Sequence, residues 1–240
     1  MKYIILIVLY LQWCATMAQE VIKSNLYHRD QPGVLLEGTN HPMQSMKMEL
    51  IKLDPGKSYK NNTQDGEQLI ISKSGSPIID SKFIHQVLTP RSVAVIVKKN
   101  KYKLKNKSQS SAWFYVITYK AKDKSKTNDT ASSFVRLFED VSFHAHDRGG
   151  VRSYFDKKTS QTNRLELHLT TLNAGLKSHE PHTHKSEEMI IMIHGDTKML
   201  IGEKDYTSKG EGVYYVESLL LHGIQNTGET SCSYFAFQWE

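Results

Sequence analysis

The chain has 240 residues, of which 39% are hydrophobic, and this is enough for one large domain or two small ones with buried cores. Its formal net charge is +6, and the positive residues cluster in two lysine-rich segments, at residues 98–107 and 120–126. Neither a recognition fold nor an aromatic platform accompanies them, which excludes a nucleic-acid-binding protein. We expect a solvated edge strand and a linker there, because lysines protect exposed strand edges. Attraction for anionic substrates stays open.

Residues 1–18 have the pattern of a secretory signal peptide. Lys2 gives a positive start, residues 3–13 are almost all apolar, and Ala18 is a small residue suited to cleavage. The apolar core of roughly 11 residues is too short to span a bilayer, and no later segment is long and apolar enough to do so. The pattern predicts an exported protein, periplasmic or secreted. Cys14 leaves a lipoprotein as the alternative, although the two residues before it fit that pattern poorly.

Cys232 is the one cysteine that remains after cleavage at this position. A single cysteine cannot form an internal disulfide, so export does not imply a disulfide-stabilised fold. Its aromatic neighbours predict a small buried hydrophobic residue rather than a reactive thiol.

Strand patterns dominate the rest of the chain. Short segments rich in Val, Ile, Tyr and Phe are separated by clusters of Gly, Asn, Asp, Ser and Pro, and several alternate apolar with polar residues. These segments lie at residues 46–53, 68–75, 92–99, 112–121, 164–172, 189–195, 197–202, 212–218 and 234–239. Only residues 132–141 could form a brief helix, and they could equally form a strand. The pattern predicts an all-β sandwich, jelly roll or barrel.

The chain also repeats weakly. Residues 50–75 and 169–195 share one outline, which runs from a strand through a glycine-containing turn and a polar segment to an apolar strand. Gln68 opens the apolar strand in the first copy and Glu188 opens it in the second, each seven positions before a glycine. This repetition predicts two similar β domains.

A charged, polar stretch at residues 120–133 reads as the connection between these domains. We therefore expect a signal peptide at residues 1–18, a first domain at 19–120, a linker with a lead-in strand at 121–160, and a second domain at 161–240.

Histidines gather at the start of the second domain. His182 and His184 are two residues apart, so both point to the same face of an extended strand. Glu188 follows four positions later, and His222 lies downstream among apolar residues. Three imidazoles and one carboxylate inside a barrel would suit a divalent first-row ion such as Mn²⁺, Fe²⁺, Ni²⁺ or Zn²⁺ and leave two octahedral positions open. A histidine-rich surface loop is the alternative.

Residues 175–195 resemble the first cupin motif: a glycine, a His-x-His pair, a glutamate after three residues, and a glycine after six more. Residues 210–226 are similar to the second motif, although Val216 stands where proline is common. The resemblance covers most of residues 164–239. It implies a cupin barrel whose metal ligands are His182, His184, Glu188 and His222.

The first half departs from that pattern. Asn62, Gln64, Gln68 and Tyr102 stand where the ligands would be, and amides with a phenol are unlikely ligands for such an ion, which implies a barrel without metal. The resemblance thus implies an all-β protein of two tandem cupin (double-stranded β-helix or jelly-roll) barrels with a metal only in the second. The ureidoglycine aminohydrolase group also binds metal in its C-terminal half only, but its ligands follow a different order.

Three residues are candidates for acid–base catalysis. Glu166 and His168 share one face of the strand at residues 164–172, while leucines alternate on the other face. This face either lines a polar cavity or is half solvated. His194 follows Glu188 by six positions and would share its face in a regular strand, where it could act as an acid–base group.

Four residues are candidates for binding the substrate. They are Arg152, Tyr154, Arg164 and Gln238. Arg152 could hold a carboxylate through its planar guanidinium group, with packing between the domains as the alternative. The second His-x-His, at residues 144–146, is assigned to the linker and His179 to a loop.

These observations predict an exported metal-binding bicupin that acts as an enzyme on a small polar or anionic substrate such as a sugar acid, by isomerase, ring-opening or lyase chemistry. One alternative is a non-catalytic protein that binds a carbohydrate or metabolite. Another is a hydrolase of the ureidoglycine aminohydrolase type. The resemblance also allows a homodimer.

Overall fold

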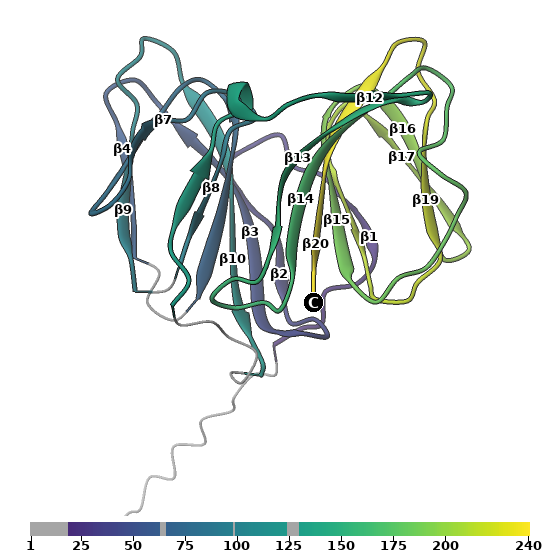
Figure 1. The fold of residues 1–240 in the computed structure, drawn as a ribbon, viewed down its shortest axis with the longest axis horizontal. Helices are drawn as coiled ribbons and strands as arrows, with labels where there is room; N and C mark the ends of the chain where they lie inside the picture. Colours follow the sequence, from purple (N-terminus) through teal and green to yellow (C-terminus); the bar gives the residue numbers. More distant parts are fainter. Residues whose placement is uncertain (1–18, 63–65, 98, 124–129) are drawn as a thin grey trace, which may run out of the picture.

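The computed structural model describes residues 19–62, 66–97, 99–123 and 130–240. The predicted signal peptide and Gln64 lie outside these ranges, as does the side chain of Asn62. The described chain forms two β-barrels that lie side by side (Figure 1). Within the described ranges, no helix has the length and apolar character needed to cross a membrane.

The first barrel consists of two sheets. The six-stranded sheet contains, in spatial order, β11 (Phe134–Arg136), β8 (Val93–Ile96), β5 (Glu67–Ser74), β10 (Ala112–Ala121), β3 (Met43–Leu53) and β2 (Gly33–Gly38). The four-stranded sheet contains β4 (Ser58–Asn62), β9 (Lys101–Lys105), β6 (Ile78–Ser81) and β7 (His85–Val87).

The second barrel repeats this plan. Its seven-stranded sheet contains β1 (Asn25–Tyr27), β18 (Val213–Val216), β15 (Glu187–His194), β20 (Cys232–Trp239), β14 (Leu165–Leu172), β13 (Gly149–Lys157) and β12 (His144–His146). Its three-stranded sheet contains β17 (Lys204–Lys209), β16 (Asp196–Ile201) and β19 (His222–Asn226). Every strand pair within these sheets is antiparallel, and all nine predicted segments overlap strands, which confirms the all-β prediction.

The two large sheets pack face to face, and the largest hydrophobic core lies between them. Smaller cores fill the interior of each barrel. Because side chains alternate along a strand, β15 contributes to two of these cores. Met189 and Ile191 enter the core between the barrels, and Ile190 and Met192 enter the core of the second barrel. Glu188 precedes Ile190 by two residues, and this register places its side chain inside the second barrel.

The strand pairing does not follow the two halves of the sequence. β1 comes from the start of the chain but pairs with β18 of the second barrel. β11 follows the first barrel's last strand but pairs back onto β8 of that barrel, so residues 132–141 form a strand and then a short 3₁₀ turn at Phe138–Asp140. The His-x-His at residues 144–146, expected in the linker, is β12 at the edge of the second barrel's large sheet.

Candidate metal centre

Main-chain pairing brings the predicted ligands together. His182 and His222 form an isolated bridge in which each N–H donates to the other residue's carbonyl, at 2.9 and 3.0 Å. His222 begins β19, and Glu188 is the second residue of β15. The ligands therefore come from one loop and from the ends of two strands in different sheets.

The four side chains converge on one point inside the second barrel. One ring nitrogen from each of His182, His184 and His222 lies within 4.8 Å of the others. A carboxylate oxygen of Glu188 lies 3.3 Å from Nε2 of His222 and 3.9 Å from Nε2 of His184. This donor set, three imidazoles and one carboxylate, suits a divalent first-row ion.

Hydrogen bonds fix which nitrogen of two rings faces the centre. Nδ1 of His184 lies 2.9 Å from the carbonyl of Ser186, and Nδ1 of His222 lies 2.8 Å from the carbonyl of Leu220. A carbonyl only accepts, so each Nδ1 carries the proton and donates it. Both Nε2 atoms are buried and make no hydrogen bond of regular geometry with the described residues; their nearest polar neighbour is the Glu188 carboxylate. A buried lone pair without a partner is costly, and a cation would satisfy both, so these residues fit a metal ion.

Glu188 is held in the orientation and charge state that a ligand needs. Gln238 donates a hydrogen bond from Nε2 to Oε1 of Glu188 at 2.8 Å. Burial raises the pKa of Glu188, but the contact with His222 and the bond from Gln238 outweigh burial and hold it below the ordinary 4.5. Gln238, predicted to bind substrate, lines the adjoining cavity and also supports a candidate ligand, in the manner of outer-shell residues in metal sites.

The pKa values of His182 and His222 are shifted in opposite directions. Burial and the neighbouring imidazoles lower the pKa of His182, which favours the neutral ring that binds metal. Burial also lowers the pKa of His222, but the nearby Glu188 carboxylate reverses this and raises it above 6.5. A proton therefore competes with a cation for Nε2 of His222, so loading with metal should release a proton.

A cavity of about 300 Å³ adjoins these ligands. One part of its wall is apolar, formed by Leu172, Ile190, Met199, Ile224 and Ala236. The other part is polar, formed by His146, His168, Thr170, His179 and Tyr234. A cavity of this size and mixed lining suits a small organic molecule with a few polar groups.

His168 faces this cavity at the end of a chain of ionic contacts. Its Nδ1 lies 3.1 Å from Oε1 of Glu166. Arg164 contacts the other oxygen of Glu166 and also binds Asp156 through two nitrogens, at 3.0 and 2.9 Å. The bond from His168 lowers the pKa of Glu166, which keeps its carboxylate charged. Glu166 and Arg164 do not line the cavity themselves; His168 is the member of this chain of contacts that does.

The structure places Arg152 and Tyr154 away from the cavity. The guanidinium of Arg152 donates to the carbonyl of Val141 and lies 4.6 Å from the ring centre of Phe138. The Tyr154 hydroxyl donates to the carbonyl of Arg91 in the first barrel at 2.8 Å. Both residues pack where the barrels meet, as the alternative interpretation proposed.

His194 is also separate from the site. It is exposed at the far end of β15, six residues from Glu188, or about 20 Å along a strand. A shift in register after Met192 breaks the regular alternation on which the prediction depended. An acid–base role for His194 at this cavity therefore has no geometric basis.

Several polar lining residues were not predicted as site residues, among them Thr170, Tyr234, His146 and His179. Thr170 and Tyr234 lie two and four residues from His168 and Gln238, so the same alternation could have identified them. His146 and His179 could not be found in this way. His146 reaches the cavity because β12 pairs with β13, and His179 lies in the loop before the ligands, where its ring centre is 4.1 Å from that of His182.

The first barrel has no comparable metal group among its described residues. Tyr102 donates its hydroxyl proton to Oε1 of Gln68, and Nε2 of Gln68 donates to Thr118, both at 2.8 Å. The rings of Tyr59 and Phe114 pack beside them, with centroids 5.7 Å apart. This interior is filled, and its polar groups satisfy one another.

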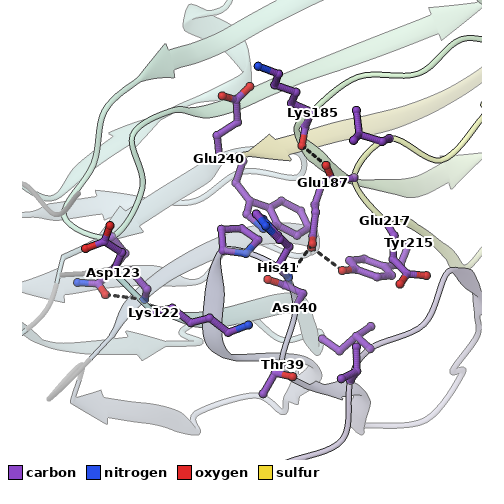
Figure 2. A pocket seen from close by; sticks show the side chains of 18 residues that line it. Thr39, Asn40, His41, Lys122, Asp123, Lys185, Glu187, Tyr215, Glu217 and Glu240 are labelled. Carbon is purple, nitrogen blue, oxygen red and sulfur yellow. Dashed lines mark hydrogen bonds between the residues drawn. The ribbon is translucent and has the colours of Figure 1, made fainter. Parts of the chain in front are cut away.

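A second cavity, of about 790 Å³, lies where the barrels meet near the C-terminus (Figure 2). None of the candidate ligands lines it. Glu187 in its wall accepts hydrogen bonds from the N–H of His41, at 2.9 Å, and from the hydroxyl of Tyr215. These contacts join a loop of the first barrel to the second barrel, so Glu187 has a structural role.

No family model matches the sequence, and no curated protein matches it either. Solved structures do share its fold. A mutant oxalate decarboxylase from Bacillus subtilis superposes with a TM-score of 0.71 at 11% identity, over 93% of this chain and 79% of that chain. The formate complex of oxalate decarboxylase from Lactobacillus farciminis gives 0.69 at 12%, over 90% and 84%. AerE from Microcystis aeruginosa gives 0.65 at 12%, over 87% and 98%. At this level of identity the likeness establishes the fold, and the chain has the cupin fold in the form of two tandem barrels.

Proposed function

We propose that the second barrel binds one divalent transition-metal ion, Mn, Fe, Ni or Zn, through His182, His184, Glu188 and His222. We propose further that this ion is the centre of an enzyme acting on a small anionic substrate such as a sugar acid. The observation that carries the proposal is the pair of buried Nε2 lone pairs, on His184 and His222, that converge with a carboxylate and have no other partner among the described residues.

The cavity supports a small acid as substrate. Its volume of about 300 Å³ limits the ligand to a few heavy-atom groups beside the metal position. Imidazoles and hydroxyls on the polar wall can donate hydrogen bonds to carboxylate oxygens. The formate bound by one structural neighbour is a small carboxylate, and this analogy adds support at the level of fold only.

His168 supplies the acid–base function in this proposal. Glu166 accepts the Nδ1 proton of His168, which leaves Nε2 free to take or give a proton on the cavity side. Arg164 and Asp156 hold Glu166 in place. A bound divalent ion would act as a Lewis acid that polarises a carbonyl or carboxylate oxygen of the substrate. Isomerisation, ring opening and elimination of a sugar acid all require proton transfer beside such a group.

Metal analysis and turnover test the proposal together. The purified protein should carry about one metal ion per chain, and Glu188→Gln should abolish both metal and turnover on a panel of uronic and aldonic acids. The matched control is Gln68→Glu at the equivalent position of the first barrel, which should leave metal content unchanged. His168→Asn should retain the metal while turnover falls about 10²–10⁴-fold. Failure of the wild-type protein to take up any of the four metals would refute the proposal.

A binding protein is the second candidate, because the first barrel keeps the fold with a filled interior and no such ligand set. In that case a sugar acid would bind with measurable affinity but would not be converted, and His168→Asn would alter affinity only. Calorimetry combined with product analysis on the same panel separates the two functions.

We also propose that the protein is exported after removal of residues 1–18, on the strength of the N-terminal sequence pattern alone. N-terminal sequencing of the protein from its native host tests this, with Gln19 as the expected first residue.

A further inference from the structure

Lysines gather on the outer face of the first barrel's four-stranded sheet, at the end of the molecule remote from the second barrel (Figure 1). They surround a shallow depression of about 530 Å³. We call this depression the basic basin; it is lined by Lys60, Asn61, Asp80, Lys101, Tyr102 and Lys103.

Strand alternation explains why the lysines share a face. Tyr102 and Leu104 of β9 are buried in the first barrel's core. Lys101, Lys103 and Lys105 take the intervening positions and so point outward. Residues two apart on a strand are separated by roughly 6–7 Å, so β9 presents a row of three amines across the sheet.

Protection of an exposed strand edge does not account for this row. The sequence predicted an edge strand here, but β9 lies inside the sheet, with β4 on one side and β6 on the other. The prediction was therefore wrong for β9. An inner strand has no free edge to protect, and a different reason for the lysines is needed.

The charges in the basic basin are poorly compensated. Lys60 and Lys103 are direct partners across β4 and β9, an arrangement of like charges that destabilises a sheet. Among the described residues, Asp80 is the one acidic residue lining the basin; it lies directly across from Lys103 in the β6–β9 register, but its carboxylate pairs with Lys105 and His85. In the described ranges, no ion pair links a carboxylate to Lys60, Lys101 or Lys103. An anionic ligand would relieve this repulsion.

We propose that the basic basin binds an acidic polysaccharide whose sugar units carry carboxylates. Phe83, in the turn between β6 and β7, lies outside the basin's lining and is 75% exposed, with the Lys82 amine 4.9 Å from its ring centre. This ring and this cation extend the surface that a carboxylated sugar polymer could contact. The choice of a polyuronide over other polyanions rests on the proposed function, because such a polymer is a source of small sugar acids. The surface would hold the polymer, a separate depolymerising enzyme would cleave its glycosidic bonds, and the distant cavity would act on the sugar acids so released.

Other polyanions fit less well. Single-stranded nucleic acid needs a succession of aromatic rings for stacking, whereas Phe83 is the one strongly exposed aromatic side chain on this sheet among the described residues. A bilayer surface is flat and would not enter a depression. Both are retained as outcomes of the test.

Binding of polygalacturonate to the metal-loaded protein at low ionic strength tests the proposal. The wild-type protein should bind it and release it as salt rises. The triple variant Lys60→Gln, Lys101→Gln, Lys103→Gln should bind at least about tenfold more weakly, from the loss of three charge-assisted contacts. The matched control, Lys23→Gln, Lys204→Gln, Lys209→Gln, removes the same charge from other exposed positions and should bind like the wild type.

Three results would overturn the proposal: no binding by the wild-type protein, equal weakening in both triple variants, or tighter binding of single-stranded DNA or of phosphatidylglycerol vesicles than of polygalacturonate. Glu188→Gln separates this inference from the proposed function. It should lose turnover and keep polygalacturonate binding; loss of both would place the polymer at the metal centre and refute a separate basin. Turnover by the lysine triple variant should equal that of the wild type.

Discussion

The two barrels share a framework and differ in what lies inside it. A spacing of 120 residues relates Gln68 to Glu188, Tyr102 to His222, and Thr118 to Gln238. In the first barrel these side chains bond to each other and close the interior. In the second, His222 and the neighbouring His184 leave ring nitrogens without a hydrogen-bond partner among the described residues. The other two ligand positions, His182 and His184, stand where the first barrel has Asn62 and Gln64. Five positions therefore separate the first barrel from the candidate metal centre of the second.

One buried asparagine in each barrel donates hydrogen bonds to two main-chain carbonyls. Substituting each of the two therefore compares the barrels directly. Asn226 donates to the carbonyls of Leu172 and Thr230, at 2.9 and 2.8 Å. Asn106 makes the same bonds to Leu53 and Ser110, at 2.8 and 2.7 Å.

The largest effect should come from these asparagines. Asn106→Ala and Asn226→Ala should each lower the free energy of unfolding by about 2–3 kcal/mol, because each leaves buried carbonyls without a donor. Only Asn226→Ala should also weaken metal binding, since it ends the strand that begins with His222. Chemical denaturation and metal titration measure the two effects. Equal effects of both variants on metal binding would contradict the assignment of the metal to the second barrel.

A smaller effect is expected from the side chains that hydrogen-bond to Glu188 in the second barrel and to Gln68 in the first, namely Gln238 and Thr118. Gln238→Leu removes the donor to Glu188 and should weaken metal binding about 10–100-fold. The counterpart Thr118→Val removes the acceptor for Gln68 and should cost about 1 kcal/mol of stability, with metal affinity unchanged. Competition with a chelator gives the affinities. Unchanged metal affinity would contradict the supporting role of Gln238, and a change in substrate affinity would support its predicted substrate-binding role, since Gln238 also lines the cavity.

The smallest effect is expected at Cys232, whose counterpart in the first barrel is Ala112. Cys232→Ala should cost about 1 kcal/mol, as a small cavity replaces the sulfur atom. Burial raises the pKa of the Cys232 thiol to about 11, so the reactive thiolate forms only as pH rises toward that value. Iodoacetamide at pH 8 should therefore label the peptide containing Cys232 in the unfolded chain and spare it in the native one. Rapid native labelling would show that the thiol is accessible.

The sequence alone predicted the structure correctly where strand alternation or motif spacing determines it. Strand alternation correctly placed His168 and Leu167 on opposite faces of β14, and the structure decides between the two alternatives for the His168 face, since His168 lines the cavity and Leu167 enters the opposite core. Motif spacing gathered the candidate ligands, although their main-chain bridge could not be foreseen. His194 was misjudged because a register shift is invisible in composition.

Contacts without a periodic pattern mark the limit of that reasoning. His146 reaches the cavity through the short hairpin of β12 and β13, which the sequence analysis assigned to a linker, and Arg152 packs on the ring of Phe138 in the 3₁₀ turn that precedes this hairpin. Neither relation leaves a periodic signal in the sequence.

The pairing of β1 with β18 has a consequence for the order in which the molecule assembles. Ser24, just before β1, bonds to Glu217, 193 residues later. The earliest strand to be synthesised thus has a partner that is among the last to emerge, and such distant closure is slow. A nascent chain therefore cannot pair this N-terminal segment with its native partner until translation is almost complete.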